Sequence, residues 1–350
     1  MKQDSIKKLI TWSEGTYSDL PWRKKRSLYG TLVSEIMLQQ TTVSTVLSHF
    51  DRFLKQFPNT KELAKSTEEE VCIAWKGLGY YRRARNLRKA AIDIEELYKG
   101  KIPLELDKLK AISGVGDYTA NAIRAIGADE VSLAIDANLE RVLARIYGIE
   151  VEKGPKLLKA IAQKFNDGMI LPNMEKIGPR KINEALMDLG RIYCQARKAN
   201  CTLCPVSASC VSFKENKVDT IPVMNEEKKK EKFFELKLLR VIVQKRDKVL
   251  GYVKSEKEWL SGQVEIPTFI IESEDVSLKQ YPKLSKKIDV DNLKKYKTSI
   301  TKYKISNYVI HLSENEFTAL TKKEKGFSFY PIENKESNFT TASHKAFKFL

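Results

Sequence analysis

Residues 109–120 read Leu109-Lys110-Ala111-Ile112-Ser113-Gly114-Val115-Gly116-Asp117-Tyr118-Thr119-Ala120, a run in which two glycines flank a valine between two helical segments. Gly114 and Gly116 allow a tight turn that exposes backbone N–H groups just ahead of the second helix. Such groups can grip a phosphate of a nucleic acid. The pattern is a helix–hairpin–helix, although an ordinary glycine turn between two helices would have the same sequence.

The chain on both sides of this turn reads as helices up to about residue 224. One apolar stripe recurs at three- and four-residue intervals and is formed by Ala84, Leu87, Ala91, Ile94 and Leu97. Helix starts are also marked. Thr67 with Glu70 fits a capping box, and Gly178-Pro179 fits a helix that begins with proline in its first turn.

The remainder of the chain has a different pattern. Residues 225–232 are too charged to be buried, and we predict a linker over residues 225–235. Beyond it, residues 238–243, 267–271 and 303–310 carry the β-branched and aromatic residues typical of strands. Because 350 residues also favour more than one domain, we predict a helical domain over residues 1–224 and a sheet-rich domain over residues 236–350.

The composition favours a polyanionic partner. The chain has 62 Lys and Arg against 45 Asp and Glu, a net charge of +17, which is typical of proteins that bind nucleic acid or anionic surfaces. No apolar run approaches the roughly 18 residues that cross a bilayer, which excludes a membrane-spanning protein. The first ten residues do not resemble a signal peptide. We therefore expect a cytoplasmic protein.

Four of the five cysteines cluster in one short segment, with the spacing Cys194-x6-Cys201-x2-Cys204-x5-Cys210. Four thiolates this close repel one another unless a cationic centre binds them, and both zinc and iron–sulfur clusters accept four cysteines. Zinc modules more often pair two Cys-x2-Cys knuckles, so the single close pair favours iron–sulfur. Free core thiols are the remaining interpretation. Cys72, beside Val71 and Ile73, is expected to be a core residue.

Two carboxylates distant in the sequence are candidates for chemistry. Glu35 lies within the largely apolar stretch 34–41, and Asp136 lies where the apolar run 133–135 meets a helix. Glu35 alone could be a solvated helix residue, and Asp136 alone could be an N-cap. Together with the hairpin, they suggest an active site.

Several motifs in the same order resemble one family. The hairpin, an aspartate about twenty residues after it, and the cysteine loop look like the endonuclease III superfamily of DNA glycosylases. Within that superfamily, four segments resemble the adenine DNA glycosylase (MutY) family: Leu20-Pro21-Trp22-Arg23, residues 34–41, Gly77-Leu78-Gly79-Tyr80-Tyr81 with the residues up to Leu87, and Asn183-Glu184-Ala185-Leu186-Met187-Asp188-Leu189-Gly190. The likeness runs nearly continuously from about Leu20 to Cys210.

The resemblance implies a fold and a partner. We expect a mainly α helix–hairpin–helix glycosylase domain over residues 1–224, with a 4Fe–4S cluster bound by the loop 194–210. A smaller, divergent Nudix-like α+β domain over residues 236–350 is expected to read the mispair. The partner would be duplex DNA containing adenine opposite 8-oxoguanine or guanine. The protein is expected to be a bacterial monomer associated with the nucleoid.

The resemblance also implies roles for individual residues. Glu35 would protonate the adenine ring, because adenine is a poor leaving group, and Asp136 would stabilise the oxocarbenium-like sugar. Tyr118 and Asn138 would orient the carboxylates and the water. Residues expected to contact DNA or the extruded base are Trp22, Arg23, Gln40, Tyr80, Gly114, Gly116 and Glu184, with Gln40 and Tyr80 as the wedges that replace the flipped nucleotide.

The identity of residue 118 bears on the mechanism. Bifunctional relatives place a lysine at this step of the hairpin, where its amine forms a Schiff base and leads to strand cleavage. A phenol cannot do so, and Tyr118 therefore predicts a monofunctional glycosylase. The alternatives are a relative acting on mismatched thymine or oxidised pyrimidines, and a non-catalytic iron–sulfur protein that binds damaged DNA.

This chain departs from the family pattern in three places. Asp136-Ala137-Asn138 stands where most relatives have Asp-Gly-Asn, which adds bulk beside the sugar. The Phe-Ser-His recognition loop of the family is expected to be replaced near Tyr303-Lys304-Ile305. Residues 270–300 contain no glutamate-rich Nudix helix, and pyrophosphatase activity is not expected.

Overall fold

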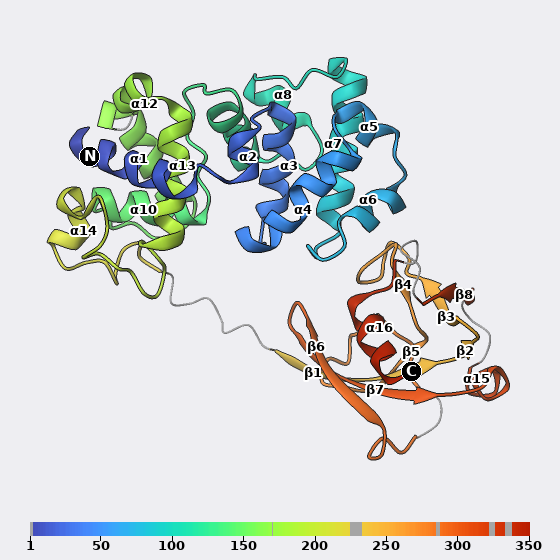
Figure 1. The fold of residues 1–350 in the computed structure, drawn as a ribbon. Helices are drawn as coiled ribbons and strands as arrows, with labels where there is room; N and C mark the ends of the chain where they lie inside the picture. Colours follow the sequence, from blue (N-terminus) through green and yellow to red (C-terminus); the bar gives the residue numbers. More distant parts are fainter. Residues whose placement is uncertain (1–2, 170, 225–232, 285–287, 322–325, 333–337) are drawn as a thin grey trace. The chain divides into compact units, whose positions relative to one another are not determined.

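The computed structural model describes residues 3–169, 171–224, 233–284, 288–321, 326–332 and 338–350. The chain divides into two compact units, residues 1–227 and residues 228–350. The first is helical and the second mixes sheet with helix (Figure 1), which confirms the predicted fold class. Most of the predicted linker, residues 225–232, lies outside the described residues, and β1 already begins at Phe234. None of the helices described is long and apolar enough to cross a bilayer.

The helical unit consists of short helices joined by tight turns. Its elements are α1 (Gln3–Tyr17), α2 (Pro21–Lys24), α3 (Leu28–Leu38), α4 (Val43–Gln56), α5 (Thr60–Lys65), α6 (Glu68–Ala74), α7 (Arg82–Tyr98), α8 (Leu106–Ala111), α9 (Asp117–Ala122), η1 (Ile123–Gly127), α10 (Ala137–Tyr147), α11 (Pro155–Lys164), η2 (Phe165–Met169), α12 (Leu171–Ile177), α13 (Pro179–Ile192), η3 (Ser207–Ser209) and α14 (Val211–Lys214).

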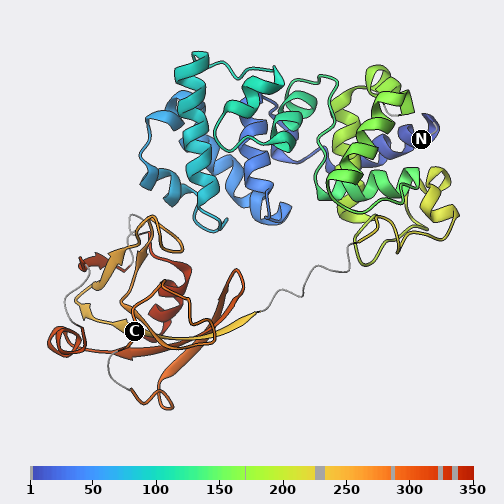
Figure 2. The same cartoon turned by 180° about the vertical axis from the view of Figure 1, so that it is seen from behind.

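These helices form two groups, each with its own core. In one group, α3, α4, α6, α7 and α8 pack around buried side chains that include Phe50, Phe53 and Trp75. In the other, the N-terminal helix α1 packs against α13, and α13 packs against α10, around Leu139, Leu143 and Leu186. Figures 1 and 2 show the two groups side by side, with α1 beside helices from far along the chain.

The local signals in the sequence account for several helix boundaries. Thr67 and Glu70 form the predicted capping box at the start of α6, and α13 begins at Pro179 after Gly178. The predicted stripe of α7 is buried at Ala84, Leu87, Ala91 and Ile94. Leu97, its last member, is instead exposed in the last turn of the helix.

The second unit is built on two small sheets. One has the strand order β5-β1-β7-β6, with β1 and β7 parallel and the other pairs antiparallel, and the second joins β2, β3, β4 and β8. The strands are β1 (Phe234–Ile242), β2 (Gln244–Lys245), β3 (Lys248–Val253), β4 (Val264–Glu265), β5 (Thr268–Ser273), β6 (Lys294–Ile300), β7 (Tyr303–His311) and β8 (Ser328–Pro331), and the helices are α15 (Glu314–Leu320), α16 (Thr341–Ala346) and η4 (Phe347–Phe349).

Residues 303–310 form the predicted strand, and a turn lies immediately before the position near which the recognition loop was expected. Tyr303, Lys304 and Ile305 do not form a loop but begin strand β7, where Tyr303 and Ile305 are buried and Lys304 is exposed. The alternation of buried and exposed side chains is that of a strand with one face on a core. The exposed turn lies just before them, at Thr301 and Lys302, between β6 and β7.

Candidate active site between the two helical groups

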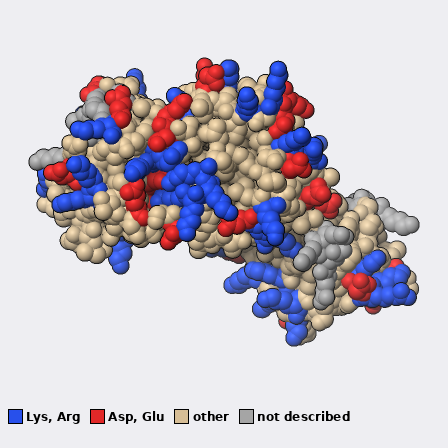
Figure 3. Space-filling view, turned by 45° about the horizontal axis from the view of Figure 1, so that its top comes forward, with Lys and Arg blue, Asp and Glu red and all other residues tan. Residues whose placement is uncertain are grey.

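One open cleft in the helical unit gathers most of the predicted site residues. Its lining comes from α2, the ends of α3 and α9, the loop before α7, and the facing sides of α10 and α13. The predicted residues that line it are Trp22, Arg23, Glu35, Gln40, Tyr80, Tyr118, Asp136, Asn138 and Glu184. The face drawn in Figure 3 shows Lys and Arg side chains gathered near the middle of this unit.

Gly114 and Gly116 do not line the cleft but form the turn between α8 and α9. Gly114 has φ +77°, and a Cβ there would come within 2.8 Å of the Cβ of Asn86 on α7. Glycine is therefore required at this position by both the backbone and the packing. The Ser113 N–H of the same turn donates to Asp93 at 2.8 Å, so helix α7 fixes the hairpin.

Glu35 lies at the bottom of the cleft in an apolar stretch of helix. Its neighbours on α3, Leu32, Val33 and Ile36, are buried, and Glu35 itself is only 5% exposed. Burial raises the pKa of Glu35 to about 7; the Tyr118 hydrogen bond and Arg23 lower it, whereas Asp136 and Glu184 raise it. Since the pKa lies near neutrality, the carboxyl group can hold a proton at physiological pH.

Tyr118 connects Glu35 to helix α9. Its hydroxyl donates to Glu35 Oε2 at 2.5 Å. Burial, followed by the nearby Glu35, raises the pKa of Tyr118 well above its usual value, so the phenol remains protonated and available as a donor. This residue therefore holds the Glu35 carboxyl in one orientation.

Asp136 is the N-cap of α10, and this capping role is compatible with a role in the cleft. Its Oδ1 accepts hydrogen bonds from the backbone N–H groups of Asn138 and Leu139 at 2.9 and 2.7 Å. Its Oδ2 accepts from Asn138 Nδ2 at 2.9 Å. A carboxylate at a helix N-terminus also interacts favourably with the helix dipole.

Asn138 is held from its other side by Arg141, which the sequence did not single out. Arg141 Nη2 donates to Asn138 Oδ1 at 2.9 Å, and Arg141 Nε donates to the Cys194 carbonyl at 2.7 Å. Arg141 also donates to the Gly190 carbonyl at 3.0 Å. The same guanidinium thus contacts both the cleft and the loop that carries the cysteines.

A network of paired charges joins α1, α2 and the residues just after α2 to α13. Arg23 Nη1 donates to Asp188 at 2.8 Å, and Arg26 donates to both oxygens of Glu184 at 2.6 and 3.1 Å. Ser13 donates to Asp188 at 2.6 Å. The side chain of Arg23 is only 8% exposed, so it is not an ordinary surface charge. Sequence reasoning missed Arg26 and Asp188, although Asp188 lies one helical turn after Glu184.

The two predicted wedges, Gln40 and Tyr80, are exposed at the rim of the cleft. Both have left-handed backbones, with φ of 53° and 47°. Such a conformation costs a non-glycine residue about 1–3 kcal/mol and persists only where the surroundings impose it. The 59% exposure of Tyr80 rules out its being a buried core aromatic.

Arg83, buried at the start of α7, imposes this conformation. Its Nη1 donates to the carbonyls of Ile36, Met37 and Gln39, and its Nη2 donates to Thr41 Oγ1 and to the carbonyls of Leu78 and Gly79. The acceptors lie on either side of Gln40 and immediately before Tyr80. One guanidinium therefore fixes both wedge loops, a role hidden in the sequence because the partners are mostly backbone atoms.

Replacing Arg83 with Lys is expected to reduce excision from a lesion duplex roughly tenfold and to lower the melting temperature by several degrees. A lysine has three donors and cannot satisfy six acceptors, and each unsatisfied buried group costs about 1–3 kcal/mol. Arg85→Lys, the same change on α7 at a residue that pairs with Glu68, is the control and should behave like wild type. Equal activity in both variants would show that Arg83 does not position the wedges.

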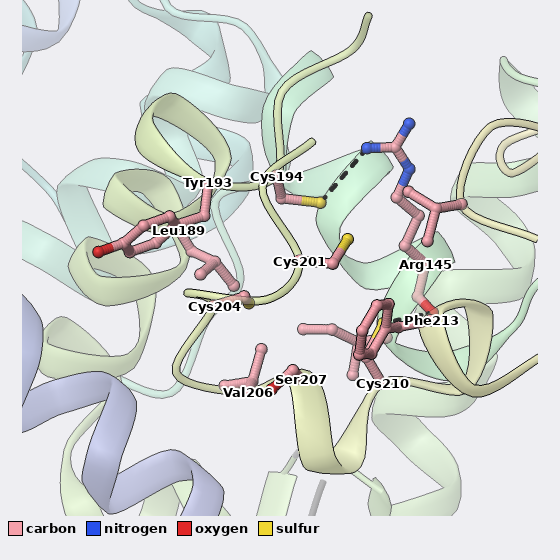
Figure 4. A pocket seen from close by; sticks show the side chains of 12 residues that line it. Arg145, Leu189, Tyr193, Cys194, Cys201, Cys204, Val206, Ser207, Cys210 and Phe213 are labelled. Atoms are coloured by element: carbon pink, nitrogen blue, oxygen red, sulfur yellow. Dashed lines mark hydrogen bonds between the residues drawn. The ribbon is translucent and has the colours of Figure 1, made fainter. Parts of the chain in front are cut away.

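The four clustered cysteines surround a second cavity, beside α10 and α13. Cys194, Cys201, Cys204 and Cys210 line it together with Arg145 (Figure 4), and all four thiols are free. Arg145 Nη1 donates to Cys194 Sγ at 3.5 Å. The described residues contain no group of three or more His, Cys, Asp or Glu placed to hold a single metal ion. Cys72, by contrast, is buried in α6 as predicted.

The chain is similar in sequence to known DNA repair proteins. Residues 33–167 match the family model of the HhH-GPD superfamily base excision DNA repair proteins. Adenine DNA glycosylase of Buchnera aphidicola from Schizaphis graminum is 33% identical over 298 residues, which is 84% of this chain and 81% of that protein. The chain belongs to the adenine DNA glycosylase family. It is thereby a DNA N-glycosylase of base excision repair.

Other known proteins are similar to a smaller part of the chain. The adenine DNA glycosylase of Homo sapiens is 34% identical over 211 residues, 58% of this chain and 38% of the human protein. A thermostable thymine-DNA glycosylase superposes with a TM-score of 0.50 at 26% identity, over 60% of this chain and 95% of that one. A trapped endonuclease III–DNA covalent intermediate, at TM-score 0.50 and 22% identity over 62% of this chain and 99% of that one, shares the fold.

Proposed function

We propose that this adenine DNA glycosylase family member excises adenine opposite 8-oxoguanine or guanine in duplex DNA, acts as a monomer, and does not cleave the strand. The observation that carries the proposal is the convergence of Glu35 and Asp136 on one cleft. The two carboxyl groups occupy different environments. Glu35 is buried with a raised pKa, whereas Asp136 accepts N–H groups at a helix N-terminus. Such a difference suits one proton donor and one charged stabiliser.

Glu35 supplies the proton in this proposal. Adenine leaves readily only when its ring nitrogen is protonated, and a carboxyl with a pKa of about 7 is matched to that task at neutral pH. Tyr118, through its hydrogen bond at 2.5 Å, keeps the donor oriented. Trp22, Arg23 and Glu184 line the same cleft and are proposed to contact the extruded base.

Asp136 acts on the sugar in this proposal. Its carboxylate stabilises the positive charge that develops on the deoxyribose as the N-glycosidic bond breaks. Asn138 holds one oxygen of this carboxylate at 2.9 Å and would orient the attacking water. The methyl group of Ala137 leaves the cap of α10 intact, so the departure from Asp-Gly-Asn is compatible with activity.

DNA binding in this proposal uses the rim of the cleft and the hairpin. Because the target atoms are hidden in the duplex, the nucleotide must be flipped out and its place filled. Gln40 and Tyr80, exposed and held by Arg83, are the proposed wedges. The turn at Gly114 and Gly116 is proposed to grip the phosphate backbone through its N–H groups.

The cysteine cavity is proposed to hold a 4Fe–4S cluster, because its four thiols are brought to one place. Four free thiols line one cavity, and four cysteine thiolates are the ligand set that such a cluster takes. Bound there by Cys194, Cys201, Cys204 and Cys210, the cluster would cross-link the loop 194–210. The Arg145 contact to Cys194 would offset the negative charge of the thiolates.

The α+β unit is proposed to read the base opposite the adenine. The turn at Thr301 and Lys302 is the exposed segment closest to the position predicted for the recognition loop, and Lys302 offers a cation beside the half-buried Phe234 ring, 4.7 Å from its centre. This assignment of residues 236–350 rests on the family resemblance.

An excision assay on four duplexes tests this proposal. Its expected outcome is loss of the base without cleavage of the strand. Duplexes carrying A opposite 8-oxoguanine, A opposite G, T opposite G, and thymine glycol are incubated with excess enzyme, and products are compared with and without alkali. Adenine should be lost from the first two, with breaks appearing only after alkali, because Tyr118 cannot form a Schiff base. Equal breaks without alkali, or faster loss of thymine, would favour the pyrimidine-acting alternative.

A further inference from the structure

One histidine of the helical unit contacts the turn that carries a proposed wedge, and the proposed chemistry does not use it. His49 lies in α4 and is half-buried. Its Nε2 atom lies 2.8 Å from the carbonyl oxygen of Lys76, at the start of the turn that follows α6 and leads to Tyr80. This contact joins helix α4 to a segment 27 positions later in the sequence.

The hydrogen-bond partners of His49 fix the orientation of its imidazole ring. The Lys76 carbonyl can only accept, which places a hydrogen on Nε2. The Nδ1 atom lies 2.9 Å from both the Ser48 hydroxyl and the Thr45 carbonyl, on the same helix. A neutral ring can donate from Nε2 while Nδ1 accepts from Ser48, and a protonated ring can donate from both nitrogens. The contact with Lys76 is therefore available in both protonation states.

The turn packs closely against this ring. Gly77 has φ +104°, and a Cβ there would come within 2.8 Å of His49 Nε2 and 3.2 Å of its Cε1. Glycine suits this position for its backbone conformation, and it also leaves room for the imidazole to reach the Lys76 carbonyl. A side chain at residue 77 would push the turn and the ring apart.

The far end of the same turn is held by a different helix. Arg83, on α7, donates to the carbonyl of Gly79 at 3.2 Å, while His49 holds the near end from α4. Tyr80 follows directly, with a left-handed backbone at φ 47° and a side chain that is 59% exposed. Because such a conformation persists only where the surroundings impose it, fixing both ends of the turn fixes Tyr80.

We propose that His49 is a positioning residue for base eversion. By holding the start of turn 76–79 against α4, it limits the positions of Tyr80 before DNA binds, so less conformational freedom is lost when the ring enters the duplex. Helix α4 begins at Val43, shortly after Gln40, so His49 also ties the second wedge to the helix that follows the first. The inference rests on the wedge role proposed for Tyr80, and His49 acts through that residue.

The test compares two amides of different length at residue 49 of the full-length protein. The amide N–H of glutamine can take roughly the place of Nε2, whereas that of asparagine reaches only the place of Nδ1. His49→Asn is therefore expected to slow single-turnover excision of adenine opposite 8-oxoguanine roughly three- to tenfold, the factor that one hydrogen bond represents. His49→Gln should restore most of the rate. Lys55→Gln, an exposed change on α4, is the control and should match wild type.

Two further readouts separate positioning from a general loss of stability. In a Tyr80→Ala background, His49→Asn should cause no further loss of rate, because the two residues act as one unit. The second readout places 2-aminopurine at the target adenine and uses Glu35→Gln to prevent excision, so that the fluorescence gained on binding reports unstacking of the base. This gain should be smaller when His49→Asn is added and should recover with His49→Gln.

Three results would overturn the proposal. They are a wild-type rate for His49→Asn, equal rates for His49→Asn and His49→Gln, and the same fold loss from His49→Asn with or without Tyr80, which would make His49 a structural residue alone. The proposed function fails on different observations. If wild type does not release adenine, the proposed activity is wrong. If Tyr80→Ala excises adenine at the wild-type rate, the wedge assignment is wrong, and the role of His49 is overturned with it.

Discussion

Replacing Glu35 with Gln is expected to slow excision of adenine roughly 10²–10⁴-fold, the range typical of losing a general acid. Glutamine has nearly the same shape and can still accept the Tyr118 hydrogen bond. It cannot transfer a proton to the leaving base. Because Glu35 is buried with a raised pKa, the neutral amide should fit the site without loss of stability. The measurement is the single-turnover rate on a duplex with A opposite 8-oxoguanine.

Two controls separate chemistry from binding in this variant. Glu35→Gln should bind the same duplex with wild-type affinity, since Glu35 lies at the bottom of the cleft rather than at its rim. Glu69→Gln, the same change at an exposed residue of α6, should retain full activity. If Glu35→Gln excised adenine at the wild-type rate, Glu35 would not be the acid.

Replacing Asp136 with Asn is expected to lower the rate by roughly two to three orders of magnitude while leaving the fold intact. Asparagine is as good an N-cap as aspartate, so its side-chain oxygen can still accept from the N–H groups of Asn138 and Leu139, which lie at 2.9 and 2.7 Å in the native protein. The substitution therefore removes the charge but keeps the cap. Electrostatic stabilisation of the developing cation is the contribution that is lost.

The melting temperature decides how the Asp136→Asn result is interpreted. It should stay close to that of wild type, and Asp107→Asn, an exposed change in the first turn of α8, should match wild type in both rate and stability. A large drop in melting temperature with a proportionate loss of rate would mean that Asp136 acts only as a helix cap.

The candidate site residues that belong to local sequence motifs could be located from the sequence. Glu35 stood out because a lone carboxylate interrupts an apolar run, and Asp136 because an apolar run ends there at a helix start. The cysteine spacing indicated a shared centre, and the four thiols indeed line one cavity. In each case the chemistry requires particular residue types at fixed local positions, which a single sequence displays.

Residues that act through tertiary contacts could not be located in this way. Arg83 lies within a run of basic residues, and its acceptors on α3 and the following loop are more than forty positions away. Arg141 likewise contacts a carbonyl 53 positions away in the sequence, and Arg26 contacts Glu184, which comes close only when the two helical groups pack together. Tyr303 was correctly predicted to lie in a strand, but the turn before it was not located, because a two-residue turn between strands leaves only a weak signal in an alternating sequence.

The pH dependence of the single-turnover rate tests the central claim most directly, because it reports which protonation state of Glu35 is active. A carboxyl whose pKa is raised to about 7 is protonated below that pH and ionised above it. With A opposite 8-oxoguanine and saturating enzyme, the rate should be highest below pH 7 and fall about tenfold per pH unit well above it, and the residual rate of Glu35→Gln should not show this decline. A wild-type rate that instead rises through pH 7 to a plateau would show that an ionised group performs the reaction and would contradict proton donation by Glu35.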